Sequence, residues 1–299
     1  MLVVTLCCFI LLCEINKSTQ ISNQEFVTLT YKQKLRFDEF RERVISKLPH
    51  DYMRQDIYLI RWLRDSFFDV NVAEKRVLDN LIWRDENKMD TILDEDWSDM
   101  EEEYKYNVEG CDRSGNPVIT AEVGDWDLRR VVLAGKSERI RRYFDRLFEE
   151  SALLLRKMGG NATQFITVMD MGNFNIISQG CPRCLPLLMS MLSTYQQHYP
   201  GCAHKVMAIN TPQYALPLWE IFKNLLDQNT RAVFNFYGRN SNEWRNSLLE
   251  DIDPSQLTKR YGGSRTTPSV DMDDLRQNGL QFNCFPPNQN NNSTDSNGV

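Results

Sequence analysis

Histidine is scarce in this sequence of 299 residues, and the usual catalytic signatures are missing. The only histidines are His50, His198 and His204. No stretch matches the glycine-rich phosphate loops, the Gly-x-Ser-x-Gly elbow or the His-Glu-x-x-His zinc pattern. Asp170 lies near the end of a predicted strand, but without a base or nucleophile beside it a structural turn bond is favoured. The sequence therefore predicts no catalytic residue, no metal site and no cofactor.

An excess of positive charge is also lacking, since the formal net charge is −6 and the pI is about 5.3. Nucleic acid needs a basic surface that displaces phosphate counterions, so it is excluded as the main partner. Arg129 and Arg130 begin a local basic cluster that could contact anionic lipid headgroups at a membrane surface. Helical pairs such as Arg146 with Glu150 favour a solvated, self-paired face instead.

Cysteines are few once the first 13 residues are set aside, because only five of the eight remain. An odd and scattered set favours a reduced compartment over a disulfide framework. Cys181 and Cys184 form a C-x-x-C pair, which can support disulfide exchange at the start of a helix. The pair lacks a thioredoxin-like context and a second pair of zinc ligands, so a structural role is favoured.

The apolar run from Leu2 to Cys13 has the length of a signal-peptide core and is too short to span a bilayer. No lysine or arginine precedes it, and no Ala-x-Ala-like cleavage site follows it. Three interpretations stay open: a weak signal peptide, a short membrane-dipping anchor, or a mistaken start site. We expect a cytoplasmic protein with transient membrane association, or a secreted one if residues 1–18 act as a signal peptide.

Helical periodicity runs from Tyr31 to Asn87 and predicts three helices, over residues 37–48, 56–67 and 71–88. Asn71 and Glu74 form a candidate capping box for the third helix. We therefore expect a hydrophobic start and linker over residues 1–30 and a helical lobe over residues 31–93.

Strands and helices alternate in the next part of the sequence. A turn from Asp112 to Asn116 leads into a strand, and a long amphipathic helix ends at Gly159 and Gly160. Three strands and three helices follow in turn, which predicts an α/β domain over residues 94–267 with a mostly parallel sheet and helical crossovers. Residues 268–299 are expected to be a polar, disordered tail.

The helix expected from Ala215 to Asp227 is unusually apolar. Its apolar arc is about 160° wide, more than the roughly 100° stripe of a helix that only covers a sheet. Such a helix faces apolar partners on two sides, although ordinary packing between helices gives the same pattern.

Five separated stretches resemble the CRAL-TRIO (Sec-fourteen-like) lipid-binding family over roughly Asp56 to Gly263. They are RWLRDSFFDVNVAEKRVLDNLIWR, DRSGNPV, FITVMDM, KVMAINTPQYALPLWEIFKNLLDQNTR and IDPSQLTKRYGG. The resemblance implies a sheet floor and helices that enclose one lipid molecule in an apolar cavity, with a helix from Leu216 to Leu226 as the lid.

The resemblance also implies site residues. On the central strand, Phe165, Thr167 and Met169 share one face, which would line the cavity, although a buried parallel strand leaves the reverse assignment open. The lid would contact lipid or membrane through Leu218, Trp219, Phe222, Leu225 and Leu226.

The expected headgroup site departs from that of phosphatidylinositol-handling members. Gly201 and Val233 replace a glutamate and a lysine, Ser66 and Phe67 replace a basic pair, and only Thr230 matches as a headgroup contact. The stretches EVGDWDLRRVVLAG and TRAVFNFYGRNSNEW look most like the tocopherol-associated animal branch.

The resemblance implies a monomeric, non-enzymatic carrier that encloses one hydrophobic ligand and exchanges it with membranes. The ligand would be a phospholipid or an isoprenoid-type lipid such as tocopherol or retinoid, and it would replace any cofactor. The alternative is a regulatory docking module that binds a small GTPase or presents lipid to a kinase.

Overall fold

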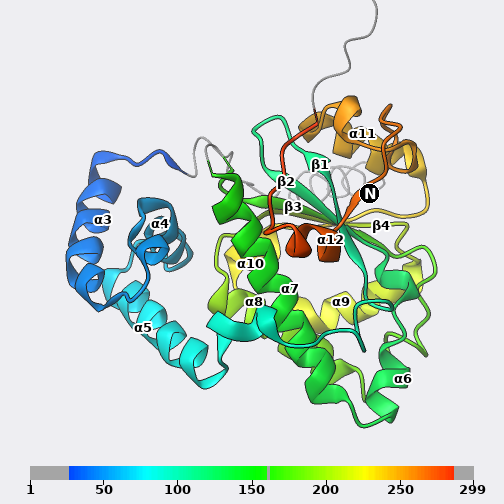
Figure 1. Ribbon diagram of the computed structural model, residues 1–299, viewed down its shortest axis with the longest axis horizontal. Coiled ribbons are helices and arrows are strands. Elements are labelled where there is room, and N and C mark those ends of the chain that lie inside the picture. Colours follow the sequence, from blue (N-terminus) through cyan, green and yellow to red (C-terminus); the bar gives the residue numbers. More distant parts are fainter. Residues whose placement is uncertain (1–26, 160–161, 286–299) are drawn as a thin grey trace, which may run out of the picture.

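The computed structural model describes residues 27–159 and 162–285 (Figure 1). An N-terminal helical lobe lies beside a larger α/β part (Figure 1). The lobe contains α3 (Tyr31–Val44), α4 (Asp56–Asp65) and α5 (Val70–Glu86). It has an apolar core of its own, in which Phe40, Trp62 and other side chains from all three helices are buried.

Helix α5 begins earlier than the sequence pattern predicts. Asp69 caps it by accepting hydrogen bonds from the backbone N–H groups of Asn71 and Val72. Glu74 instead forms an ion pair with Lys47 at 2.7 Å. The predicted capping box of Asn71 and Glu74 is therefore wrong, because the nearer carboxylate already satisfies the free N–H groups.

One six-stranded sheet forms the centre of the larger part, in the order β5-β4-β3-β2-β1-β6. Strands β2 to β5 run parallel, whereas β1 pairs antiparallel with both β2 and β6. The predicted mostly parallel sheet is thus confirmed. The strands are β1 (Tyr106–Cys111), β2 (Pro117–Ala121), β3 (Phe165–Asp170), β4 (Ala203–Ile209), β5 (Phe234–Phe236) and β6 (Val270–Asp271).

Helices cover both faces of the sheet. Helix α11 (Ser241–Asp251) packs on one face, where Trp244 and Leu248 join the core. Helices α7 (Ser137–Met158), α8 (Leu185–His198) and α9 (Leu216–Phe222) lie on the other side (Figure 1). Helix α6 (Leu128–Leu133) precedes α7, and the short helices α10 (Gln228–Ala232) and α12 (Met272–Gln277) come after α9 and α11.

Helix α9 is shorter than the helix predicted over residues 215–227. It ends at Phe222 and continues as a 3-10 turn over Lys223–Leu225, after which Leu226 is extended. Asp227 then caps α10 by accepting the N–H of Thr230 at 2.7 Å. A residue that caps a new helix must leave helical geometry, so the apolar pattern spans two helices with a break between them.

The prediction of a disordered tail is wrong for residues 268–285. Strand β6 pairs with β1, and Met272 and Leu280 are fully buried in the main core. A disulfide joins Cys284 to Cys111 in β1. Few apolar residues suffice here, because the sheet edge and α7 supply the rest of the core. Residues 286–299 of that prediction lie outside the described residues.

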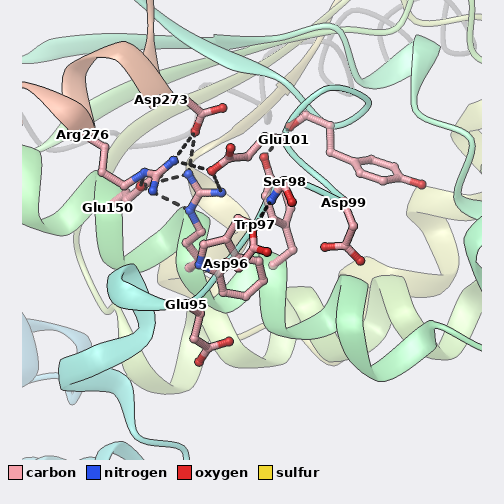
Figure 2. Close-up of polar contacts among 12 residues, drawn as sticks. Glu95, Asp96, Trp97, Ser98, Asp99, Glu101, Glu150, Asp273 and Arg276 are labelled. Atoms are coloured by element: carbon pink, nitrogen blue, oxygen red, sulfur yellow. Dashed lines mark hydrogen bonds and ion pairs between the residues drawn. The ribbon is translucent and has the colours of Figure 1, made fainter.

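Buried ion pairs also hold this C-terminal segment (Figure 2). Arg146 of α7 pairs with Glu150 at 3.2 Å, as predicted, and with Glu101 at 3.0 Å. Arg146 and Glu150 are fully buried, so the prediction that this pair lies on a solvated face is wrong. Asp273 of α12 accepts a further bond from Arg146, and Arg276 reaches Glu150 at 3.1 Å. A charge that is buried this deeply needs several partners to neutralise it. The partners of Arg146 come from three separate segments of the chain.

Four of the five cysteines among the described residues are paired, contrary to the prediction of a reduced set. Cys111 bonds to Cys284, and Cys181 bonds to Cys184 at the start of α8. Cys202 is free and buried. The odd number of cysteines concealed two pairs, one of which joins residues 173 positions apart.

Candidate functional site

The face of the sheet that is turned away from α11 is apolar and only partly covered. Strand register places Thr167 beside Ile119 and Val206, and Val206 beside Phe234, so these side chains share a face. On β3, Phe165 is buried, whereas Thr167 and Met169 are half-buried. Because β3 lies inside the sheet, partial exposure there means that the helices on this side do not seal it.

The other face of β3 is fully packed. Ile166 and Val168 are buried against the cluster that includes Trp244 and Leu248 of α11. The two faces therefore differ, and the half-buried face is the one that holds Phe165, Thr167 and Met169.

Helix α9 lies over the half-buried face through aromatic contacts. The ring of Trp219 lies 4.9 Å from the ring of Phe234 and 4.8 Å from that of Phe236, measured between centroids. Phe222 and Leu226 are buried, and Leu218 is half-buried. Of the predicted lid residues, Trp219 therefore contacts the sheet, Leu218 lies against Gly180 of the neighbouring loop, and Leu225 is 50% exposed.

Apolar side chains also cover the outer surface of this segment. Ile221 is 52% exposed, and Leu216 is exposed as well. The adjoining loop contributes exposed Ile177, and it is held to the lid segment by a hydrogen bond from the Tyr214 hydroxyl to the Phe174 carbonyl at 2.6 Å. Helix α9 therefore presents apolar surface on two sides.

A polar cluster lies where α10 meets the helical lobe. The Asp65 carboxylate pairs with Arg76 at 2.7 Å and accepts a long bond from Asn229 at 3.5 Å. Thr230 is buried, and its hydroxyl donates to Asp227 at 3.2 Å. Burial raises the pKa of Asp65 despite the nearby Arg76 cation, and Asp227 raises it further. This cluster contains the one matching headgroup residue, Thr230.

The two arginines proposed for a membrane surface are exposed at the start of α6. The backbone N–H of Arg129 donates to the Ser178 carbonyl at 2.8 Å, which places α6 against the loop beside the lid. Arg130 forms an ion pair with Glu103. Arg130 is therefore partly neutralised, as self-pairing predicts.

The remaining chemical candidates have structural surroundings. Asp170 accepts hydrogen bonds from Gly172 and Asn210 and pairs with Arg260. Burial alone would raise the pKa of Asp170, but these donors outweigh burial and hold that pKa below its usual value. His198 stacks on Trp83 at 3.7 Å between ring centroids. Within the described ranges, no three ligand-type side chains gather in a way that could hold a metal ion.

The hydrophobic start, Leu2 to Cys13, lies outside the described residues. Among the helices that the structure describes, none has the length and apolar character needed to cross a bilayer.

Comparisons with known proteins agree with this architecture. The chain is 27% identical over 243 residues to the phosphatidylinositol/phosphatidylcholine transfer protein SFH9 of Arabidopsis thaliana. The matched region covers 75% of this chain and 40% of that protein. It is 26% identical over 249 residues to SFH4 of the same plant, a protein with the same description. The chain thus spans about 40% of the length of these curated relatives.

A solved structure shows the same fold. The crystal structure of Sfh5 superposes with a TM-score of 0.65 at 14% identity, over 81% of this chain and 91% of that one. The family profile described as the CRAL/TRIO domain matches residues 101–263, which is more than half of the sequence. The protein therefore belongs to the CRAL/TRIO domain family.

Proposed function

We propose that this protein is a non-enzymatic lipid carrier, which holds one lipid between the half-buried sheet face and α9 and exchanges it with membranes. The observation that carries the proposal is the two-sided character of α9. Trp219 meets Phe234 and Phe236 on the inner side, while Ile221 and Leu225 are exposed on the outer side. Burying a lipid chain contributes about 0.8 kcal/mol per methylene, which offsets its removal from the bilayer.

For the cargo we propose a phospholipid. The relatives SFH9 and SFH4 are described as phosphatidylinositol/phosphatidylcholine transfer proteins, whereas the predicted tocopherol-associated branch has no support from them. The polar end of the lipid is proposed to contact Thr230 and its neighbours. Because Ser66 and Phe67 stand where a basic pair was expected and Asp65 is buried there, a zwitterionic headgroup suits this cluster better than an anionic one.

The compartment is proposed to be oxidising, as in the secreted alternative, in place of the expected cytoplasm. Two disulfides in the described residues support this assignment, because cytosolic thiols are kept reduced. Peptide mapping of the protein, isolated from its natural source with thiols blocked at lysis, tests it. We expect two peptides that are joined by the disulfide between Cys111 and Cys284. Blocked thiols at both positions would contradict the oxidising compartment and favour the cytoplasm.

Mass spectrometry of the organic extract tests the carrier itself. The protein would be purified without detergent from a eukaryotic host and compared with a mock purification. We expect one phospholipid per protein molecule, with phosphatidylcholine enriched over phosphatidylinositol. One tocopherol or retinoid molecule per protein molecule would contradict the proposal of a phospholipid cargo. An empty extract that persists after incubation with mixed liposomes would contradict the carrier and favour the docking module.

A further inference from the structure

A small cavity of about 30 Å³ lies between the helical lobe and the α/β part, away from the sheet face described above. The lobe contributes Tyr52, Arg61 and Arg84 to its lining, and α7 contributes Glu149 and Arg156. By volume it has room for about two water molecules. None of the proposed lipid-contacting side chains lines it, so a role for this cavity is independent of the proposed function.

The charges around this cavity do not balance. Three guanidinium groups line it, from Arg61, Arg84 and Arg156, together with one carboxylate, Glu149. Glu149 is already shared, because it pairs with Arg84 at 2.8 Å and with Arg156 at 3.0 Å. It also accepts the hydroxyl of Tyr199 at 2.9 Å. Its two oxygens are therefore committed. Arg84 also pairs with Asp90 at 2.6 Å, so Arg84 and Arg156 have counterions and the charge that remains is that of Arg61.

Arg61 carries the uncompensated charge. Its side chain is only 9% exposed, and within the described residues it has no carboxylate within ion-pair distance. Its side chain donates from a terminal nitrogen to the carbonyl of Thr163, which is a neutral acceptor. A buried cation without a counterion is costly, so an anion that entered beside it would be held strongly.

Unused hydrogen-bond donors surround the same cavity. The Nε atoms of Arg61 and Arg84 and the hydroxyl of Tyr52 are buried without a hydrogen-bond partner among the described residues. Burial raises the pKa of Tyr52, which keeps its hydroxyl protonated and able to donate. Buried donors normally have partners, so three orphaned donors around one cavity indicate a missing acceptor.

We propose that this cavity binds a phosphate group, with Arg61 as its counterion and Tyr52 and Arg84 as further donors. Guanidinium groups match the geometry of phosphate oxygens, and the volume suits the insertion of one or two oxygens, not of a whole lipid headgroup. The group comes either from free inorganic phosphate or from the end of a larger phosphorylated molecule, a lipid headgroup included.

Titration calorimetry of the intact chain with inorganic phosphate tests the site, at neutral pH and with ionic strength held constant by chloride. We expect saturable binding of one phosphate per chain. Tyr52→Phe removes one donor and keeps the ring under Arg156, so we expect affinity to fall about tenfold, as for a hydrogen bond to a charged group. Arg61→Gln should abolish measurable binding.

Tyr237→Phe is the matched control, because that hydroxyl bonds to Ser247 on the opposite side of the sheet. It should bind phosphate as the natural sequence does. If Arg61→Gln fails to fold, the comparison of Tyr52→Phe with Tyr237→Phe still tests whether the cavity binds phosphate. Equal affinity in those two variants would overturn the site.

A second arm distinguishes the source of the phosphate. Vesicles of phosphatidylcholine with and without a phosphatidylinositol monophosphate, whose inositol carries a terminal phosphate, are titrated into the same variants. Binding of the phosphatidylinositol monophosphate vesicles that depends on Tyr52, without binding of inorganic phosphate, identifies a lipid headgroup as the source. No saturable binding in either arm overturns the proposal, and it does so whether or not the organic extract contains a lipid.

Discussion

His198 illustrates at the residue scale how packing between the lobe and the α/β part sets a charge state. Its ring stacks on Trp83 of α5, and its Nδ1 lies 3.0 Å from the amide oxygen of Asn80. Burial lowers the pKa of His198, and together with the nearby cations Arg84 and Arg76 it brings that pKa to about 4. The folded protein therefore holds this imidazole neutral.

The shift gives a pH dependence with a defined sign. In the unfolded chain His198 takes up a proton near pH 6.5, whereas in the folded chain it resists protonation down to about pH 4. At this residue the unfolded state thus binds more protons in that interval, so the contribution of His198 to the free energy of unfolding should fall as pH falls from about 6.5 toward 4.

Urea unfolding of the natural sequence and of His198→Phe, between pH 7 and about pH 4.5, measures this effect. Phenylalanine keeps a ring for stacking on Trp83 but has no proton to take up, so its stability should depend less on pH. The lower limit avoids the range in which Glu149 becomes protonated. Burial alone would raise the pKa of Glu149, but Arg84 and Arg156 outweigh burial and hold that pKa below 4.5. Parallel curves for the two proteins would contradict the assignment.

Among elements, α9 was recognised from its sequence, but its length was not. The apolar pattern from residue 215 to residue 227 correctly indicated a segment with apolar surface on two sides. The break after Leu225 depends on Asp227, whose side chain caps the next helix, α10. Capping a new helix competes with continuing the first one, and the spacing of apolar residues does not reveal which of the two prevails.

Charge on the outer side of α9 should impair exchange with membranes. Ile221→Glu changes a side chain that is 52% exposed, so the fold should persist, while a carboxylate at the bilayer surface is unfavourable. We expect transfer of a fluorescent phospholipid between vesicles to slow about tenfold. Ile82→Glu, on α5 and 58% exposed, is the matched control and should transfer normally. Equal slowing in both variants would argue against α9 as the membrane-facing element.

For the molecule as a whole, the C-terminal segment closes the fold. It adds β6 to the sheet edge, places α12 on the buried network of Arg146, and ends at the disulfide to β1. This disulfide links residues 173 positions apart, whereas the one at the start of α8 links residues three positions apart. Their effects on the unfolded chain should therefore differ.

Removing the long-range disulfide should cost more stability than removing the local one. The loop-closure relation gives roughly 5 kcal/mol for the long loop and roughly 2 kcal/mol for the short one, as upper values. Guanidinium unfolding of Cys284→Ala and Cys181→Ala, without reductant, measures the difference. A larger loss in Cys181→Ala would show that the C-terminal segment is held by packing and ion pairs instead.

By itself the sequence determined the order of the main helices and strands up to α11, the mostly parallel sheet, the helical lobe and the strand face that bears Phe165, Thr167 and Met169. Those features follow from local periodicity and from motifs that are contiguous in the chain. Whether the strand face and lid residues serve a lipid remains a proposal. Only the tertiary structure decided the packing of residues 268–285, the pairing of the cysteines and the cation excess around Arg61. Each of these joins groups far apart in the sequence, where no local pattern records which partner lies nearby.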